Sequence, residues 1–110
     1  MSREAVGNFE LMVLLAVVRL GENAYGVPVS KVIEESTGRE VLLGSVYAAL
    51  DRLEAKGLVT SQRGESTAAR GGRAKRYFRI TQKGLGQARE TRVALTKLWQ
   101  RIPALQGGTQ

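Results

Sequence analysis

The sequence predicts an α+β fold that is mainly helical, and three observations lead to it. Apolar side chains recur at helical spacing through much of residues 9–56. Two stretches rich in β-formers then flank a glycine-rich loop between residues 58 and 81. Beyond them, apolar residues follow a heptad spacing up to residue 102. With 110 residues, the chain can bury the core of one domain.

Two helices are expected first, over residues 9–20 and 27–36. The first carries apolar side chains nearly all round, as a helix buried within a domain does, and Gly21 ends it. The second has Pro28 in its first turn and Gly38 after its last. These are the helix positions that proline and glycine favour.

A short extended strand is expected at residues 39–43 and a third helix at 44–56. Val46, Leu50 and Leu53 recur at i, i+4 and i+7 in this helix, which predicts one buried face. The opposite face is expected to point outward and to carry small residues with a single charge: Gly44, Ser45, Ala48, Ala49 and Arg52.

Residues 58–64 and 73–81 are expected to pair as a β-hairpin around a loop at 65–72. In the returning strand, alternation places Phe78 and Ile80 on one face. The opposite face then carries the polar and charged side chains of Lys75, Tyr77 and Arg79.

Thr81 is a favourable N-cap for a last helix, expected at residues 82–102. The order helix, helix, short strand, helix, strand, loop, strand, long helix is that of a winged helix-turn-helix, in which the hairpin loop is the wing. We therefore expect a winged helix-turn-helix DNA-binding domain at 1–81, a long C-terminal dimerisation helix at 82–102 and a disordered tail at 103–110.

The net charge of +7 is spread unevenly along the chain. Residues 1–55 contain five basic and eight acidic residues, a net charge of −3, whereas the remainder contains twelve basic and two acidic residues, a net charge of +10. This strongly basic second half predicts a polyanionic partner. The first candidate for this partner is nucleic acid and the second is a membrane surface. The alternative is a basic surface that only aids solubility.

Residue types that carry much enzyme and metal chemistry are missing from the sequence. It has no cysteine and no histidine, so it offers no thiolate or imidazole for catalysis or for a metal. We expect no enzymatic activity, no metal and no cofactor. The longest apolar run, residues 11–18, is too short to cross a bilayer, and the N-terminus lacks the pattern of a signal peptide. A cytoplasmic protein without a membrane partner is expected.

The second and third helices form the expected helix-turn-helix pair, and the third is the expected recognition helix for double-stranded DNA. On its outward face, Ala48 lets the backbone approach the groove, while Ser45 and Arg52 are expected to read bases. Tyr47, at the edge of this face, has two open interpretations: a hydroxyl contact to phosphate, or a half-buried ring between helix and wing. For Arg52, the alternative is an ion pair with a neighbour such as Glu35 or Asp51.

The wing is expected to follow the phosphate backbone or to enter the minor groove. Its glycines let the loop approach closely, and its basic side chains supply the countercharge. Phe78 and Ile80 would anchor the hairpin to the core, so that the charges are held on a rigid strand. The residues expected to contact DNA from the wing are Arg70, Arg73, Lys75 and Arg76.

The last helix carries a heptad seam that is expected to form a homodimer with help from the apolar first helix. Trp99, the single tryptophan, would either pack in that interface or stack on a flat aromatic ligand, and packing is the favoured interpretation. A two-fold dimer presents two recognition helices to a palindromic site. The expected dimerisation residues are Leu11, Leu15, Leu85, Ala88, Arg92, Leu95, Trp99 and Ile102.

Several stretches resemble the PadR family of bacterial transcriptional regulators, in its small branch with a single C-terminal helix. The most specific are LLGSVYAALDRLEAKGLV at 42–59 and GGRAKRYFRIT at 71–81. FELMVLLAV at 9–17 and YGVPVSKVIEEST at 25–37 are similar too, so the resemblance covers roughly residues 7–84.

The resemblance implies a dimeric winged-helix repressor whose C-terminal helix builds the dimer with help from the N-terminal helix. Some members bind phenolic or other flat aromatic compounds near that interface and release DNA. Tyr47 matches the family tyrosine of the recognition helix. The sequence departs from the pattern at Leu42, where a serine cap is usual, and at Ala48 and Ala74, where proline is common. The wing pattern is matched by Gly72, Arg73, Lys75, Arg76 and Tyr77.

The sequence therefore predicts a transcriptional repressor that acts as a homodimer on a palindromic operator, with release by a small aromatic ligand as a further expectation. The alternative is a winged-helix module that docks protein or RNA without sequence-specific DNA binding. The two differ in whether a dimer selects a particular duplex sequence.

Overall fold

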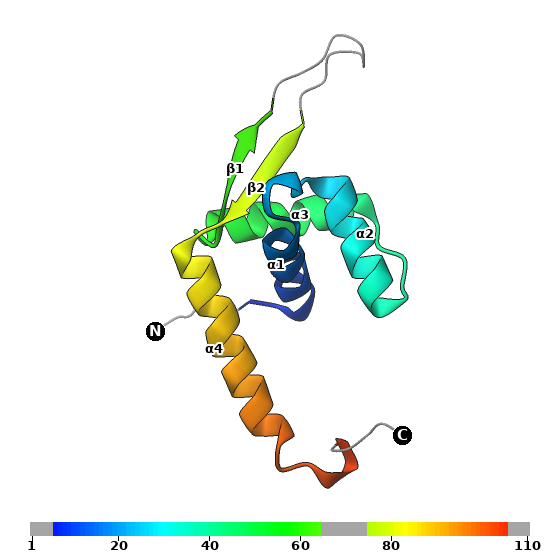
Figure 1. The fold of residues 1–110 in the computed structure, drawn as a ribbon, viewed down its shortest axis with the longest axis vertical. Coiled ribbons are helices and arrows are strands. Elements are labelled where there is room, and N and C mark those ends of the chain that lie inside the picture. The colour runs from blue at the N-terminus through cyan, green and yellow to red at the C-terminus, as the bar shows by residue number, and fades with distance from the viewer. Residues whose placement is uncertain (1–5, 65–74, 106–110) are drawn as a thin grey trace.

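The computed structural model describes residues 6–64 and 75–105 of the chain. Helices predominate, and one antiparallel hairpin forms the sheet (Figure 1), so the predicted mainly helical α+β fold is confirmed. The described elements are, in chain order, α1 (Asn8–Leu20), a 3-10 turn (Gly21–Asn23), α2 (Gly26–Thr37), α3 (Leu43–Ala55), β1 (Val59–Arg63), β2 (Arg76–Ile80), α4 (Gln82–Trp99) and a further 3-10 turn (Pro103–Leu105).

Local chemistry sets the helix ends that the sequence predicted. Gly21 follows α1 with a φ of 59° and Gly38 follows α2 with a φ of 75°, and positive φ favours glycine over residues that carry a Cβ. At the start of α4, the Thr81 hydroxyl accepts a hydrogen bond from the Gly84 N–H at 2.9 Å, as an N-cap does. These signals involve only neighbours in sequence, which is why they could be read without the fold.

The core lies where α1, α2 and α3 meet the inner face of the hairpin (Figure 1). α3 contributes the buried face that its apolar spacing predicts, and β2 contributes Phe78. Burying a large aliphatic side chain stabilises a fold by about 1.5–3 kcal/mol, so this packing fixes α3 against the other helices. The largest fully buried side chains are Leu14, Leu50, Leu53, Leu58, Val13, Val17, Val29, Val46 and Val59.

The hairpin is joined to the helical body by a backbone hydrogen bond near the start of α2. β1 and β2 are antiparallel, with Arg63 opposite Arg76 at the end next to the loop. The Phe78 N–H donates to the Ala24 carbonyl at 2.8 Å. Since Ala24 lies two residues before Gly26, the first residue of α2, this bond fixes the distance between the hairpin and the helix-turn-helix.

Residues 39–43 do not form the short strand that the sequence predicted. The sheet of the described residues has two strands, and this segment is in neither. The Val41 N–H instead donates to the Glu34 carboxylate at 2.9 Å. A strand needs a neighbouring backbone as hydrogen-bond partner, and here a side chain of α2 takes that role. The connection between α2 and α3 is therefore a loop held by Glu34.

α4 is shorter than predicted, because it ends at Trp99 rather than at residue 102. Ile102 lies in a turn in which its N–H donates to the Trp99 carbonyl at 3.2 Å. Pro103–Leu105 then form a 3-10 turn, where the sequence indicated a disordered tail. The remainder of that tail, residues 106–110, lies outside the described residues.

α4 extends away from the rest of the molecule (Figure 1). Within α4, all of which is described, only Gly84 is buried. A Cβ at Gly84 would overlap the carbonyl oxygen of Leu58, so glycine lets the start of α4 lie against the hairpin. None of the helices in the described part of the chain has both the length and the apolar composition that a bilayer span requires.

Candidate nucleic-acid interface

The exposed face of α3 is uncharged in its first half, as predicted, and small apart from Leu43, but one predicted residue is placed differently. Ala49, expected to point outward, is fully buried. Residue 49 lies three positions after Val46 and four before Leu53, so the helix turns it to the same side as these core residues. The exposed residues in this half of α3 are Leu43, Gly44, Ser45 and Ala48.

The N-terminal end of α3 presents two leucines to solvent. Leu42, at the N-cap, is 76% exposed, and Leu43 is 40% exposed. Leucine offers no side-chain acceptor to the free N–H groups of the first turn, where serine or aspartate is preferred. Neither leucine belongs to the core, which leaves both available for contact with a partner.

Tyr47 is half-buried and packs on the start of α2. A Cβ at Gly26 would overlap the Tyr47 ring and its hydroxyl, so glycine makes room for the tyrosine here. Of the two interpretations left open by the sequence, the half-buried ring describes this packing, and the neighbour seen among the described residues is the start of α2. Contact between the hydroxyl and a phosphate stays a prediction.

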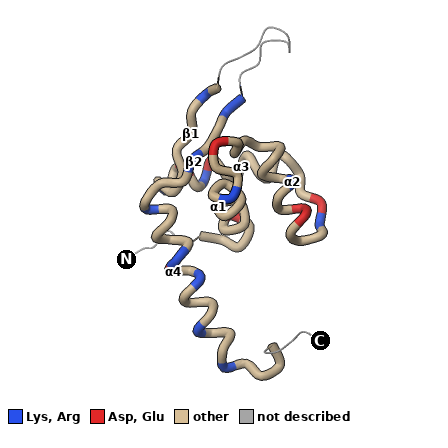
Figure 2. Tube along the Cα trace, viewed as in Figure 1, with Lys and Arg blue, Asp and Glu red and all other residues tan. Residues whose placement is uncertain are grey.

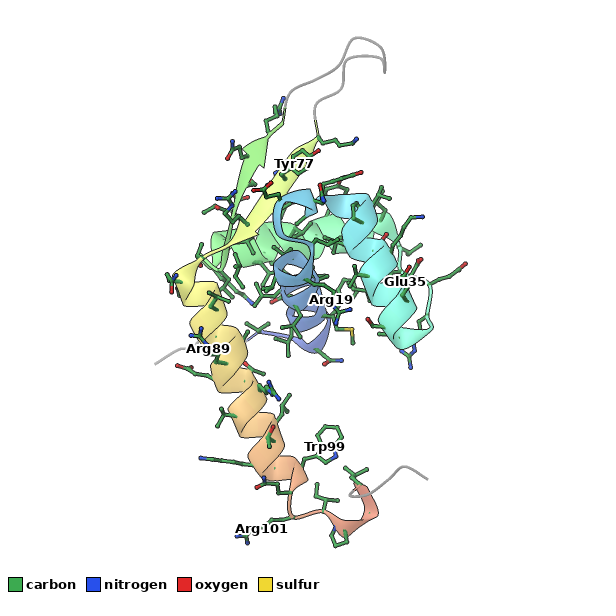
Figure 3. The ribbon with its side chains drawn as sticks, in the orientation of Figure 1. Arg19, Glu35, Tyr77, Arg89, Trp99 and Arg101 are labelled. Carbon is green, nitrogen blue, oxygen red and sulfur yellow. The ribbon has the colours of Figure 1, made fainter. Side chains whose placement is uncertain are left out.

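The outer face of β2 lies against the turn that precedes α2. Tyr77 meets Tyr25 edge to face, with ring centres 5.3 Å apart, and Lys75 Nζ lies 4.9 Å from the centre of the Tyr25 ring. Figure 3 shows Tyr77 on the strand beside this turn. A cation over an aromatic face is attracted to it, so the ring positions the lysine. We call Tyr25, Lys75 and Tyr77 the tyrosine–lysine cluster.

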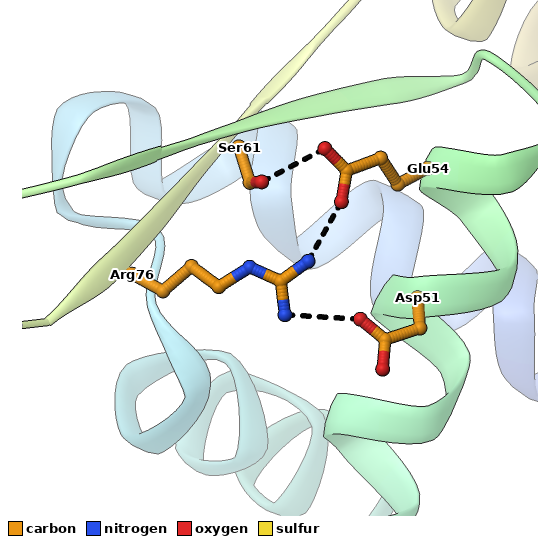
Figure 4. A network of polar contacts seen from close by, with 4 residues as sticks. All are labelled: Asp51, Glu54, Ser61 and Arg76. Atoms are coloured by element: carbon orange, nitrogen blue, oxygen red, sulfur yellow. Dashed lines mark hydrogen bonds and ion pairs between the residues drawn. The ribbon is translucent and has the colours of Figure 1, made fainter.

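Arg76 points the other way, toward α3 (Figure 4). Its Nη1 lies 3.0 Å from Asp51 Oδ1 and its Nη2 lies 2.7 Å from Glu54 Oε1. Ser61 on β1 donates to the second Glu54 oxygen at 2.8 Å. The sequence predicted Arg76 among the phosphate contacts, and such a contact stays a prediction. Alternation along β2 puts Arg76 on the face of Phe78. In the structure, Arg76 joins the hairpin to α3.

The charges in this network stabilise one another. The hydrogen bond from Ser61 lowers the pKa of the Glu54 carboxyl, and the bond from Arg76 adds to it, so that together they outweigh burial. Burial alone would lower the pKa of the Arg76 guanidinium, but its hydrogen bonds to Asp51 and Glu54 raise it. Arg76 and Glu54 are therefore both charged at neutral pH.

Arg52 has its partner on α1. Its Nε lies 2.5 Å from one carboxylate oxygen of Glu10, and Lys56 Nζ lies 2.7 Å from the other. Glu10 is 7% exposed. Burial alone would raise the pKa of Glu10, but hydrogen bonds from Lys56 and Arg52 lower it. Arg52 thus forms an ion pair, as its alternative interpretation supposed, but with Glu10, 42 residues away in sequence, which the sequence did not single out as its partner. Base reading by Arg52 stays a prediction.

Basic side chains gather at the open end of the hairpin and recur along α4 (Figure 2). Arg63 and Lys75 are exposed at the hairpin end. Two further predicted wing contacts, Arg70 and Arg73, lie outside the described residues. Across residues 6–64 and 75–105, no group of three or more acidic, histidine or cysteine side chains could hold a metal ion.

A groove of about 670 Å³ lies between α1 and α4. Trp99, which is 52% exposed, projects from the last turn of α4 (Figure 3). Leu85 and Ile102 do not line the groove, whereas the other residues predicted for dimerisation do. Those lining residues are Leu11, Leu15, Ala88, Arg92, Leu95 and Trp99.

Three residues of this region were not predicted from the sequence. Glu10 is an acidic residue within an apolar helix, and burial of a charged side chain signals a partner. Tyr25 precedes Gly26, the glycine that makes room for an aromatic ring. Glu54 follows Asp51 by three residues, so both carboxylates lie on one side of α3 and together suit one arginine.

A helix-turn-helix whose exposed helix lies beside a basic hairpin defines the winged-helix class of DNA-binding proteins. The chain belongs to the transcriptional regulator PadR-like family, whose profile matches residues 14–90. The resemblance seen in the sequence is thereby confirmed. PadR-family proteins are DNA-binding transcriptional regulators, and the family is not one of enzymes.

Solved structures share this fold. A PadR-family regulator from Eggerthella lenta is 26% identical, with 89% of this chain and 83% of that chain covered and a TM-score of 0.69. A PadR-like regulator from Bacillus cereus is 25% identical, with 91% and 92% covered and a TM-score of 0.70. A PadR-family regulator from Clostridium difficile is 20% identical and shares the fold. The match covers 92% of this chain and 100% of that chain, with a TM-score of 0.75. No curated protein matches the chain significantly.

Proposed function

We propose that the chain is a sequence-specific transcriptional repressor that binds a palindromic operator as a homodimer and catalyses no reaction. The observation that carries the proposal is the surface shared by α3 and the tyrosine–lysine cluster. It combines a recognition helix of small exposed side chains with a lysine held beside the start of α2. Membership of a family of DNA-binding regulators supports it. Such a protein meets its operator in the cytoplasm.

In the proposed complex, the first half of α3 enters the major groove. Ser45 and Ala48 meet the base edges, because they are exposed and small. Tyr47 and Lys75 contact phosphates on either side, since contacts to the backbone fix the position of a protein on the duplex.

The basic residues of the wing divide into two groups in this proposal. Arg70 and Arg73 follow the phosphate backbone beside Lys75. Arg52 and Arg76 act by positioning α3, because the guanidinium group of each is hydrogen-bonded to acidic side chains. Removing either arginine would shift or loosen the recognition helix.

The dimer is proposed to form along α4 and α1. Leu15, Leu95 and Trp99 are 50%, 43% and 52% exposed in the single chain, and all three line the same groove. Burial of such side chains favours association at about 25 cal/mol per Å² of apolar surface. A second copy packed here would bury them and place the two recognition helices on one side of the dimer.

We propose the same groove as the place where a flat aromatic compound releases the protein from DNA. Trp99 offers a ring for stacking, and Arg92 offers a cation within the same lining. A compound bound there would change the angle between the two α4 helices. The separation of the recognition helices, and with it the fit to the operator, would change as a result.

The test is the mass of the native protein in solution, with and without a pool of random DNA duplexes whose bound members are sequenced. A dimer that enriches a palindrome supports the proposal and yields the operator. A monomer, or a dimer that enriches no sequence, contradicts it and favours a module that docks protein or RNA.

A further inference from the structure

The part of a recognition helix that meets base edges is its N-terminal end. In this chain that end comprises Leu42, at the N-cap, and the first turns of α3 up to residue 48. All of these residues lie in the described part of the chain, so their side chains can be compared with the chemistry of the major groove.

The side chains at this end are almost entirely apolar. Between residues 42 and 48 there is no arginine, lysine, asparagine, glutamine, aspartate or glutamate. Bidentate hydrogen bonds to guanine or adenine require one of these side chains. Tyr47 is packed against Gly26, which leaves the Ser45 hydroxyl as the exposed polar group. Leu42, by contrast, is 76% exposed.

The charged side chains that follow on α3 are already engaged. Asp51 accepts a hydrogen bond from Arg76 at 3.0 Å. Arg52 donates its Nε hydrogen to the Glu10 carboxylate, which draws the guanidinium toward α1. Both residues lie beyond the N-terminal end of α3, and each takes part in a bond that holds α3 in place.

We propose that α3 recognises its operator mainly through the C5-methyl groups of thymines in the major groove, contacted by Leu42, Leu43 and Ala48. The thymine methyl is the apolar group that base pairs present there, and alanine and other apolar side chains pack on it. This inference rests on the proposed function, since it concerns the same surface of α3. The basic hairpin supplies affinity for the backbone without reading sequence.

The experiment replaces thymine by uracil, one position at a time, in the operator selected from the random pool. Uracil pairs as thymine does and lacks only the methyl group. Replacing a thymine that α3 contacts should weaken binding about fourfold, because burying one methyl or methylene group contributes about 0.8 kcal/mol. Uracil outside the half-sites should leave the dissociation constant unchanged, which provides the control on the DNA side.

Two protein variants provide the other control. With Leu42→Ala, the ratio of thymine to uracil affinity should fall toward one at the contacted positions. Leu98→Ala removes a leucine that is 67% exposed on α4 and should preserve that ratio. Circular dichroism confirms that both variants are folded.

Three results would overturn the inference. One is specific binding that survives complete replacement of thymine by uracil within twofold. Another is a loss of about tenfold or more when 7-deazaguanine removes a guanine acceptor, since that would mean bidentate readout of guanine. In both cases the repressor proposal stands. A wild-type protein that enriches no duplex sequence would overturn both proposals together.

Discussion

At Arg76, one guanidinium group joins the hairpin to α3. Its partners Asp51 and Glu54 are 59% and 36% exposed as side chains, so the ion pairs are partly screened by water and contribute little to folding. Their effect on the surface is larger. Without Arg76, two carboxylates would stand uncompensated beside the proposed path of the DNA and repel its phosphates.

Replacing Arg76 by alanine should therefore weaken binding to every duplex while leaving the slope of log K against log salt nearly unchanged. The matched control is its neighbour, Lys75→Ala, which should reduce the magnitude of that slope by about one, as loss of a phosphate contact does. Fluorescence anisotropy across a salt series measures both slopes. A slope that falls equally in the two variants would mean that Arg76 contacts phosphate, as the sequence predicted.

Residue roles could be predicted where they follow from local spacing, and could not where they depend on a distant partner. Alternation along β2 correctly placed Phe78 inside, and the same alternation, applied to Arg76, would have placed it toward α3. Arg52 is different, because Glu10 is 42 residues away and no local pattern connects the two. The sequence predicted Ala49 on the outward face. It lies three residues after Val46, however, and so belongs to the buried face of the helix.

Among the elements, those with local start and stop signals were predicted well. Gly21, Gly38 and the Thr81 cap act through their nearest neighbours, so the ends of α1 and α2 and the start of α4 follow from sequence. The segment 39–43 was predicted wrongly because a strand depends on a partner backbone that sequence does not show. The end of α4 was also missed, since the apolar series continues past the point where helical geometry stops.

The junction of α4 with the hairpin depends on one residue. Gly84→Ala would press a methyl group into the Leu58 carbonyl oxygen, which is backbone and cannot move aside. Overpacking of this kind costs about 1–3 kcal/mol, so the free energy of unfolding should fall by that amount. Urea titration followed by circular dichroism measures the change.

Gly86→Ala, two residues further along α4, is the control. A Cβ there would have nothing within 4 Å, and alanine is favoured over glycine inside a helix by about 0.5–1 kcal/mol. This variant should be slightly more stable than the wild type. If the two variants were destabilised alike, the cost would lie in helix formation rather than in the junction.

The molecule as a whole leaves a large apolar surface unburied on α4 and α1. Trp99→Asp should dissociate the proposed dimer, because a central aromatic residue contributes about 2 kcal/mol or more to an interface, about thirtyfold in the dissociation constant. Light scattering over a concentration series measures that constant.

Val93→Asp is the matched variant for this measurement. Val93 is also on α4 and has the same 52% exposure as Trp99, but it does not line the groove. It should leave the dimer intact. A dimer that survives Trp99→Asp, or that is lost equally in both variants, would place the interface on another face.

Because α4 projects from the body and is anchored at Gly84, it acts as a lever in the proposed dimer. Its 18 residues span about 27 Å at a rise of about 1.5 Å per residue. A tilt of about 10° at its base therefore moves its far end by about 5 Å. Duplex DNA presents equivalent groove positions only once per turn, about 34–36 Å apart. The number of base pairs between the operator's half-sites should therefore depend on the tilt of α4. That number can be read from the selected DNA sequences alone.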